Sequence, residues 1–226
     1  MSKEPDEGPV DGRMPHEPSG RLPQPAVGRL SLYFRELHRL NDGGTSHTSS
    51  RELGQLVDVS PAVVRRDLSA MGTIGRRGVG YEVVKLIDAI GQLLGSGVQW
   101  RVVLVGVGSL GDALLRYRGF ERLGFRLTDA FDSDPAKWGR QVGGVLVSDA
   151  SVMAGRLMET RPELAILAVP ADQAPQVAAV LVGAGVSGIL NFAPTMLKLP
   201  GTTAVVNVDL ASELQRLAFS VQNSAR

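Results

Sequence analysis

The sequence predicts a chain of the α/β class with a smaller α+β domain: a winged helix-turn-helix, then a doubly wound parallel sheet, then a C-terminal helix. Three observations predict it. The first part of the chain has helical apolar spacing, serine caps and an arginine-rich glycine turn. In the second part, short apolar runs alternate with helical stretches, as in a parallel sheet buried between helices. A glycine-rich turn directly follows the first of those runs, which is typical of α/β domains that bind nucleotides.

Composition excludes several classes of function. The 226 residues include no cysteine, which excludes disulfides, thiolate catalysis and cysteine-ligated metal centres. The formal net charge is only +1, so any surface for nucleic acid must be a local patch. No apolar run approaches the ~20 residues of a membrane span, and the N-terminus lacks the apolar core of a signal peptide. We therefore expect a cytoplasmic protein without a membrane or metal partner.

Four segments are expected along the chain. Residues 1–24 hold five prolines and five acids but only three basic residues, with no apolar period, which predicts a disordered arm. Residues 25–94 are expected to form the helix-turn-helix domain and residues 98–206 the nucleotide-binding α/β domain. Residues 207–226 are expected to form one C-terminal helix with a leucine stripe, begun by Asp209 as its cap.

Helical spacing and capping residues predict the first three helices. The first ends at Asn41-Asp42-Gly43-Gly44, and its buried stripe comprises Leu30, Tyr33, Phe34, Leu37 and Leu40. Ser49 and Glu52 form a capping box that begins a second helix. Ser60 and Pro61 stand in the order expected at the start of a third. Only two residues separate the second and third helices, which is a helix-turn-helix spacing.

The segment after the third helix is rich in glycine and arginine. Gly72 to Gly80 contains four glycines around Arg76-Arg77, which predicts a tight β-hairpin, the wing of a winged helix. Tyr81 to Leu94 is predicted to be a helix that leads out of the domain. Between Ser60 and Tyr81 there are four arginines and one acid, a local charge of +3. The segment is therefore a candidate surface for DNA.

The candidate DNA contacts follow from this arrangement. Arg65 and Arg66 lie on the third helix, where a recognition helix meets the major groove. One of the two can read a guanine edge and the other a phosphate, and the sequence does not assign them. Arg76 and Arg77 suit phosphate or minor-groove contacts, and Ser49 and Ser50 suit a phosphate at a helix N-terminus. The alternative is an ordinary three-helix domain with solvated arginines.

The second half of the chain alternates strands with helices. The expected buried strands are Val102–Val105, Arg126–Phe131, Val145–Val147, Leu164–Val169 and Gly188–Asn191. Helical stretches between them include Gly111–Tyr117 and Ala174–Gly183. This order predicts a Rossmann-type doubly wound sheet.

A dinucleotide-binding turn follows the first of these strands. Its residues match G-x-G-x-x-G and are Gly106, Val107, Gly108, Ser109, Leu110 and Gly111. The first glycine permits the tight turn, the second lets backbone amides approach a pyrophosphate, and the third lets the helix pack on the strand. Asp132 follows Gly106 by 26 residues at the end of the next strand. A carboxylate there accepts hydrogen bonds from ribose hydroxyls and repels a 2′-phosphate, which favours NAD(H) over NADP(H). The alternatives are a turn without a nucleotide, or a coenzyme A or flavin site.

The α/β region does not favour an enzyme. Hydride transfer needs a proton donor or acceptor near the substrate, and the histidines (His16, His38 and His47) all precede this region. Tyr117 is followed at the fourth position by Glu121, so it lacks the lysine of a Tyr-x-x-x-Lys pair. Little chain remains for a substrate domain. We therefore expect a sensor without catalytic residues.

Several strings of residues resemble the Rex family of redox-sensing repressors. They are Val64-Arg65-Arg66-Asp67-Leu68-Ser69 followed by Gly72, Gly75-Arg76-Arg77-Gly78-Val79-Gly80-Tyr81, Gly108-Ser109-Leu110-Gly111, Tyr117-Arg118-Gly119-Phe120, Gly124-Phe125, Phe131-Asp132-Ser133-Asp134-Pro135, Asn191-Phe192-Ala193-Pro194 and Val208-Asp209-Leu210. The resemblance runs from about Pro25 to Phe219. It implies a homodimer that binds a palindromic DNA operator, releases it when NADH binds, and swaps its C-terminal helix onto the partner.

The resemblance also implies roles for individual residues. Ser69, Gly78 and Tyr81 join the candidate DNA contacts. Asp132 and Ser133 belong to the cofactor site, Val169 and Pro170 lie by the pyrophosphate, and Asn191, Phe192, Ala193 and Pro194 lie near the nicotinamide. The residues implied to couple nicotinamide state to the DNA-binding domain are Arg29, Tyr117, Asp209 and Leu210, with Leu210 inserted near the partner's nicotinamide pocket.

Three hypotheses remain open at this point. The first is an NAD(H)-responsive repressor that takes NADH and NAD⁺ as ligands. The second is a nicotinamide-dependent oxidoreductase with a fused helix-turn-helix domain. The third is a coenzyme A-binding regulatory module with such a domain.

Overall fold

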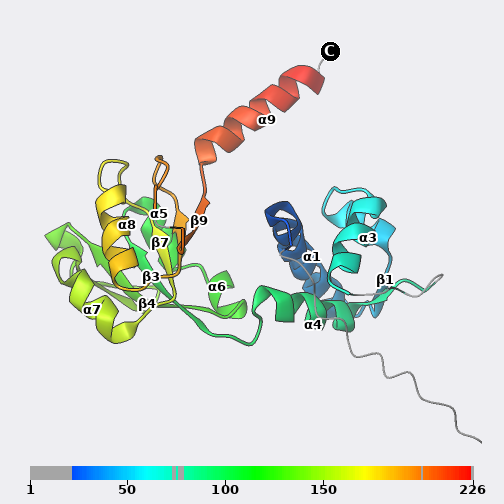
Figure 1. Cartoon of the computed structure of the whole chain (residues 1–226), viewed down its shortest axis with the longest axis horizontal. Coiled ribbons are helices and arrows are strands. Elements are labelled where there is room, and N and C mark those ends of the chain that lie inside the picture. The colour runs from blue at the N-terminus through cyan, green and yellow to red at the C-terminus, as the bar shows by residue number, and fades with distance from the viewer. Residues whose placement is uncertain (1–21, 73–74, 76–78, 200, 225–226) are drawn as a thin grey trace, which may run out of the picture. The chain divides into compact units, whose positions relative to one another are not determined.

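The computed structural model describes residues 22–72, 75, 79–199 and 201–224 of the chain, and these form two compact units divided between Gly97 and Val98 (Figure 1). Residues 1–21 of the predicted arm lie outside the described residues. So do three of the predicted DNA contacts, Arg76, Arg77 and Gly78.

The first unit is mainly helical. Its helices are α1 (Gln24–Asp42), α2 (Ser50–Leu56), α3 (Pro61–Ala70) and α4 (Val83–Leu94). The predicted apolar stripe of α1 packs with Leu53, Val64, Leu68 and the buried face of α4 in one core. Because each helix is apolar on only one side, this shared core orients all of them at once. The core leaves the outer side of α3 exposed.

The predicted caps of α2 and α3 are confirmed. Ser49 Oγ accepts a hydrogen bond from the Glu52 backbone N–H at 3.1 Å, and Glu52 accepts one from the Ser49 N–H at 2.8 Å. Ser60 Oγ accepts from the Val63 N–H, with Pro61 as the first helical residue. These contacts satisfy amides that have no acceptor within the helix, and so fix where each helix begins.

A two-stranded sheet joins the segment that precedes α2 to the segment that precedes α4. The strands β1 (His47–Thr48) and β2 (Tyr81–Glu82) pair antiparallel, with Thr48 opposite Tyr81. The predicted helix Tyr81–Leu94 is therefore wrong in its first two residues, which form β2 before α4 begins at Val83. Two residues are too few to show a sequence period, which is why neither strand was predicted. Most of the predicted wing between Gly72 and Gly80 lies outside the described residues.

The second unit is a mostly parallel sheet of the predicted doubly wound type. Its strand order is β5-β6-β4-β3-β7-β8-β9, and only the β5–β6 pairing within it is antiparallel. The strands are β3 (Trp100–Val105), β4 (Phe125–Asp132), β5 (Gln141–Val142), β6 (Val145–Asp149), β7 (Leu164–Leu167), β8 (Gly188–Asn191) and β9 (Ala204–Asn207). Strands β5 and β9 were not predicted; the first is short, and the second is partly exposed.

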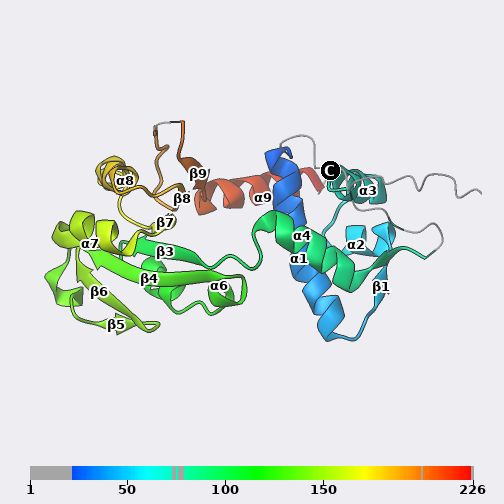
Figure 2. The ribbon, with the colours of Figure 1, turned by 60° about the horizontal axis from the view of Figure 1, so that its bottom comes forward.

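Helices cover the two faces of this sheet (Figure 2). They are α5 (Ser109–Leu115), α6 (Gly119–Arg122), α7 (Met153–Thr160) and α8 (Ala174–Gly183), with short 3-10 turns η1 (Pro135–Lys137) and η2 (Ala150–Val152). Alternate residues of β3 point to opposite faces, as strand geometry requires. Val103 and Val105 pack with α7 and α8, whereas Val102 and Leu104 pack with Leu115 of α5.

The last helix, α9 (Leu210–Ser224), follows β9 after two residues and agrees with the predicted C-terminal helix. Within the described residues, no helix is both long and apolar enough to cross a membrane.

Removing the Ser49 hydroxyl tests the capping box. Ser49→Ala leaves the first-turn amides of α2 without their acceptor, so local stability should fall by about 1 kcal/mol. Hydrogen–deuterium exchange of the α2 amides should then be about fivefold faster. Ser50→Ala is the matched control, because the Ser50 hydroxyl does not cap the helix and accepts from Arg65 Nη1 instead. Equal exchange in both variants would contradict the assignment.

Candidate functional site

The glycine turn at the end of β3 is built by close backbone approaches. Gly106 has φ +96°, and a side chain there would collide with the carbonyl of Ala168. A side chain at Gly111 would collide with the Gly106 carbonyl oxygen, so α5 can pack on the turn only with glycine at this position. Gly108 is different: among the described residues, no atom beyond Gly108 and its two chain neighbours lies within 4 Å of where its Cβ would be. The open space beside Gly108 is available to a ligand.

A cleft of about 510 Å³ opens beside this turn, at the carboxyl ends of the strands. Ligands of open α/β sheets bind in this place. The cleft brings together six of the predicted cofactor residues: Gly106, Gly108, Asp132, Ser133, Val169 and Pro170. The other predicted residues, Val107, Ser109, Leu110, Gly111 and Asn191 to Pro194, do not line it. Asp134, Lys137 and Gln173 line it and were missed.

Asp132 is tied to the glycine turn itself. Its side chain lies at the end of β4, and the residue is only 7% exposed. Oδ2 accepts hydrogen bonds from the Val107 backbone N–H at 2.7 Å and from Lys137 Nζ at 3.0 Å. Oδ1 accepts from the Asp134 N–H at 2.8 Å. The carboxylate thus joins the turn after β3 to the loop after β4, and a ribose hydroxyl would share it with these donors.

The negative charge of Asp132 is compensated by the hydrogen-bond donors that surround its carboxylate. Burial on its own raises the pKa of Asp132, but hydrogen bonds from the Asp134 N–H, Lys137 and the Val107 N–H outweigh it, so this pKa lies below its ordinary value. Lys137 also lies 3.9 Å from Asp134. A lysine five residues after a strand-end acid was the available signal for Lys137, because η1 folds that lysine back onto the acid.

Asn191 organises the loop that follows β8. It is 1% exposed, and Nδ2 donates to the Thr195 carbonyl and to Asn207 Oδ1, both at 2.9 Å. Its Oδ1 accepts from the Ala193 N–H at 3.0 Å. The side chain therefore shapes the Phe192–Pro194 loop from inside, at the same edge of the sheet as the glycine turn.

The outer face of α3 carries the predicted DNA contacts that the structure describes. Arg65, Arg66 and Ser69 are exposed. Arg65 Nη1 donates to Ser50 Oγ at 3.1 Å, which ties the start of α2 to the outer face of α3. Ser49 is engaged in its cap, and Tyr81 lies in β2 with its ring against Gly75.

Asp67, the one acid of this predicted surface, faces inward. It is 3% exposed and receives three hydrogen bonds. Arg29 donates through Nε at 2.7 Å and Nη2 at 2.8 Å, and Tyr33 Oη donates at 3.0 Å. Burial and the bond to Asp67 raise the pKa of Tyr33, and the same carboxylate raises the pKa of Arg29. Because Arg29 neutralises Asp67, the arginines on the outer face of α3 act without a local counter-charge.

The remaining switch residues lie in the second unit. Asp209 caps α9: its carboxylate accepts from the backbone N–H groups of Ala211 and Ser212 and from the Ser212 hydroxyl. Tyr117 is 59% exposed and packs edge-on against Phe120. Leu210 is exposed at the start of α9. Arg29, the switch residue of the first unit, binds Asp67.

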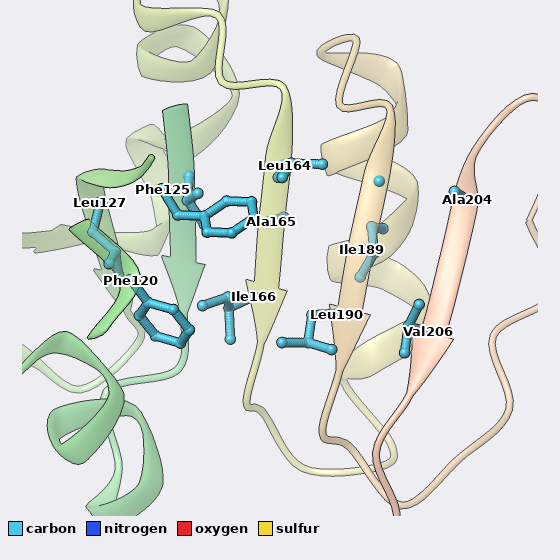
Figure 3. A pocket seen from close by; sticks show the side chains of 12 residues that line it. Phe120, Phe125, Leu127, Leu164, Ala165, Ile166, Ile189, Leu190, Ala204 and Val206 are labelled. Carbon is cyan, nitrogen blue, oxygen red and sulfur yellow. The ribbon is translucent and has the colours of Figure 1, made fainter. Parts of the chain in front are cut away.

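A second hollow of about 370 Å³ lies on the open face of the sheet (Figure 3). Ile166, Leu190 and Val206 stand side by side on β7, β8 and β9, in register with one another. Phe120 and Phe125 form another wall. The lining is apolar throughout, which suits a protein surface better than a charged ligand.

Two family models match the chain. "CoA binding domain" matches residues 98–195, and "Putative DNA-binding protein N-terminus" matches residues 21–69. The first match covers most of the sheet, and the second covers the helices up to α3.

Relatives match over nearly the whole chain. The redox-sensing transcriptional repressor Rex of Rhodopirellula baltica is 65% identical over 202 residues, covering 89% of this chain and 85% of the relative. Among solved structures, the Rex-family repressor RSP in complex with beta-NAD+ and operator DNA is 30% identical, with a TM-score of 0.84, and covers 92% of this chain and 95% of that chain. RSP in complex with beta-NADH is 29% identical, with a TM-score of 0.82, and covers 92% and 97%.

Asp132→Asn tests the link between the acid and the glycine turn. Since the folded-state pKa of Asp132 is lowered, its stabilisation is complete above the unfolded pKa near 3.9 and is lost as pH falls through the lower folded value. The variant should lose about 2 kcal/mol of unfolding free energy at pH 7, with the difference shrinking below about pH 4. Urea denaturation followed by tryptophan fluorescence measures this, since Trp138 Nε1 donates to the Asp132 carbonyl.

Asp134→Asn is the control for that experiment. Asp134 is more exposed, caps the η1 turn and lies 3.9 Å from Lys137, so Asp134→Asn should lower the free energy of unfolding by at most about 1 kcal/mol. A loss in Asp132→Asn that does not change with pH would contradict the account.

Proposed function

The chain belongs to the Rex family of redox-sensing transcriptional repressors, and we propose that it binds a DNA operator and releases it when NADH occupies the cleft beside the glycine turn. The single observation that carries the proposal is the pairing of that cleft with the exposed arginines of α3 in one chain. The second unit is proposed to sense NADH, and the first, helical unit is proposed to bind DNA.

The cleft suits a dinucleotide. The open space at Gly108 leaves room for a pyrophosphate against the backbone, and the amides that begin α5 have no acceptor within the helix. Asp132, Asp134 and Lys137 together carry a net negative charge at the ribose end, which disfavours a 2′-phosphate. NAD(H), when bound, supplies a nicotinamide whose charge changes by one between its oxidised and reduced forms. The predicted cofactor residues outside the cleft lining remain proposed contacts.

The α3 surface suits duplex DNA. Arg65 and Arg66 are proposed to face the major groove, with Ser69 beside them and Ser50 held by Arg65. Because Asp67 is buried and paired, no carboxylate of α3 opposes the phosphate backbone. Ser49, Tyr81 and the arginines beyond the described residues complete the proposed contact set. A protein that binds DNA and NAD(H) is proposed to act in the cytoplasm.

The coupling between the two units is proposed to run through Arg29, Tyr117, Asp209 and Leu210. Arg29 uses Nε and Nη2 for Asp67, which leaves Nη1 for a second carboxylate. Asp209 can serve as that carboxylate only by sharing or giving up its α9 cap. The proposed switch is an equilibrium between an arrangement with the Arg29–Asp209 contact and one without it. A ligand shifts this equilibrium only if it binds the two arrangements with different affinity.

No catalytic role is proposed. The residues that line the described cleft include no histidine or tyrosine, and the carboxylates and lysine there bind one another. The relatives are named as repressors. The match of residues 98–195 to a coenzyme A-binding model supports a second candidate, a regulator that takes coenzyme A.

We also propose that the chain works as a homodimer. The leucines at 210, 214 and 217 repeat along one side of α9, and each is about 60% exposed or more. The sheet hollow offers an apolar surface on the same unit. A second copy of this chain can cover both surfaces at once, and a two-fold dimer matches a palindromic operator.

Release of DNA by NADH is the direct test of the proposed function. The full chain first selects a duplex from randomised DNA, and fluorescence anisotropy then follows that duplex during separate titrations with NADH, NAD⁺, NADPH and coenzyme A. NADH should release the duplex at concentrations where NADPH does not. Gly108→Ala should bind the duplex normally but respond to NADH at least about tenfold less, because its methyl group fills the space for the pyrophosphate.

Gly155→Ala is the control, since its Cβ also meets no atom but lies on α7, away from the cleft. Release by coenzyme A alone would replace NAD(H) by the second candidate. Failure to select any duplex would refute DNA binding.

Charges on the α9 stripe test the dimer. Leu214→Glu/Leu217→Glu should shift the protein from dimer to monomer in sedimentation velocity at micromolar concentration, since two carboxylates cannot be buried without partners. The affinity for the operator should fall as the dimer dissociates, because a monomer contacts only one half of a palindromic site. Gln215→Glu, exposed on another side of α9, should stay dimeric. A wild-type monomer would contradict the homodimer.

A further inference from the structure

The buried carboxylate of α3, Asp67, has so far been described only as a neutralised charge and as a partner of Arg29. Asp67 lies one residue after Arg66 and one before Leu68. Val64 and Leu68, its neighbours on the inner side of α3, are fully buried in the apolar core. A carboxylate at such a position costs free energy unless it is paired and hydrogen-bonded.

Two residues one turn apart on α1 supply every described partner of that carboxylate. Arg29 donates two parallel hydrogen bonds, at 2.7 and 2.8 Å, one to each oxygen, and Tyr33 donates a third at 3.0 Å. A guanidinium and a carboxylate bound in this way lie in one plane. The contact therefore fixes direction as well as distance, which apolar packing of Val64 and Leu68 does not.

The direction matters because of helix geometry. Successive residues on an α-helix are about 100° apart, so Arg65 stands about 160° from Asp67 around the axis of α3. Because Asp67 is held against α1, Arg65 points away from the core. Ser69 follows Arg65 by one turn of α3 and therefore lies on the same outer side. Their exposure agrees with this geometry.

We propose that the contact of Asp67 with Arg29 and Tyr33 is a positioning device, which fixes the rotation of α3 and thereby sets which DNA sequence the protein prefers. The inference rests on the proposed DNA binding. Base edges are read by bidentate contacts that demand exact aim, whereas phosphate contacts tolerate small rotations. The device should therefore govern preference for the operator, and leave general affinity for DNA intact.

An apolar replacement of the whole network provides the test. Arg29→Met/Tyr33→Phe/Asp67→Leu keeps the net charge and the buried volume, and replacing a buried ion pair in this way is commonly neutral or stabilising. The control is Glu36→Leu/Arg39→Met, which removes a 2.9 Å ion pair between a half-buried glutamate and an exposed arginine of the same helix, with the same charge balance.

Affinities for the selected operator duplex and for a scrambled duplex are measured with the full chain in NAD⁺ over a range of salt concentrations. The triple variant should fold, bind scrambled DNA with an unchanged salt slope, and lose about tenfold in its operator-to-scrambled ratio. The control should keep the wild-type ratio. A folded triple variant with the wild-type ratio would overturn the proposal, as would equal losses on both duplexes.

Arg29→Lys keeps the inference testable if the triple variant fails to fold. Lysine keeps the charge but cannot form two parallel hydrogen bonds, so the ratio should fall about threefold at near wild-type melting temperature. An unchanged ratio in Arg29→Lys overturns the positioning role. A wild-type protein that binds neither duplex refutes the proposed DNA binding itself.

Discussion

A buried parallel sheet needs cover on both faces, and that constraint shapes the second unit. Helices α7 and α8 close one face with Val103, Val105 and Phe131. On the other face, α5 and α6 cover only part, and an apolar hollow remains over β7, β8 and β9. The chain then continues into α9, whose leucines are exposed. Two unsatisfied apolar surfaces on one unit are the physical basis for proposing a second copy, and a two-fold pair of helical units in turn fits a palindromic operator.

In each unit, a buried carboxylate joins two segments through directional hydrogen bonds. Asp132 joins the glycine turn to the loop after β4, and Asp67 joins α3 to α1. Buried ion pairs add little net stability, because desolvation offsets most of the attraction. Their directional hydrogen bonds instead select one arrangement among packings of similar energy. Asp132 is proposed to shape the cleft in which the ligand binds, and Asp67 to orient the helix that contacts DNA.

Much of this architecture could be predicted from the sequence. The five strands from Val102 to Asn191 and the caps at Ser49 and Ser60 have local signals, namely apolar runs and short polar spacings, and the structure contains them. The strands β1, β2, β5 and β9 are too short or too exposed to give such a signal. The hydrogen-bond partners of Asp67 and Asp132 could not be predicted, because these partners, Arg29 in one case and Val107 in the other, come close only through tertiary folding. Asp67 was counted as a surface charge for that reason.

In the proposed function, the nucleotide site and the DNA surface share one coupling free energy. Such coupling is reciprocal: if NADH weakens operator binding by some factor, the operator must weaken NADH binding by the same factor. Isothermal titration calorimetry of NADH into the full chain, alone and saturated with its selected operator, measures this factor as a change in NADH affinity. It thereby complements the DNA-release experiment, which measures the change in DNA affinity. NADH binding should be at least about tenfold weaker in the presence of the operator, equivalent to about 1.4 kcal/mol. An NADH affinity that is the same with and without the operator would contradict this coupling.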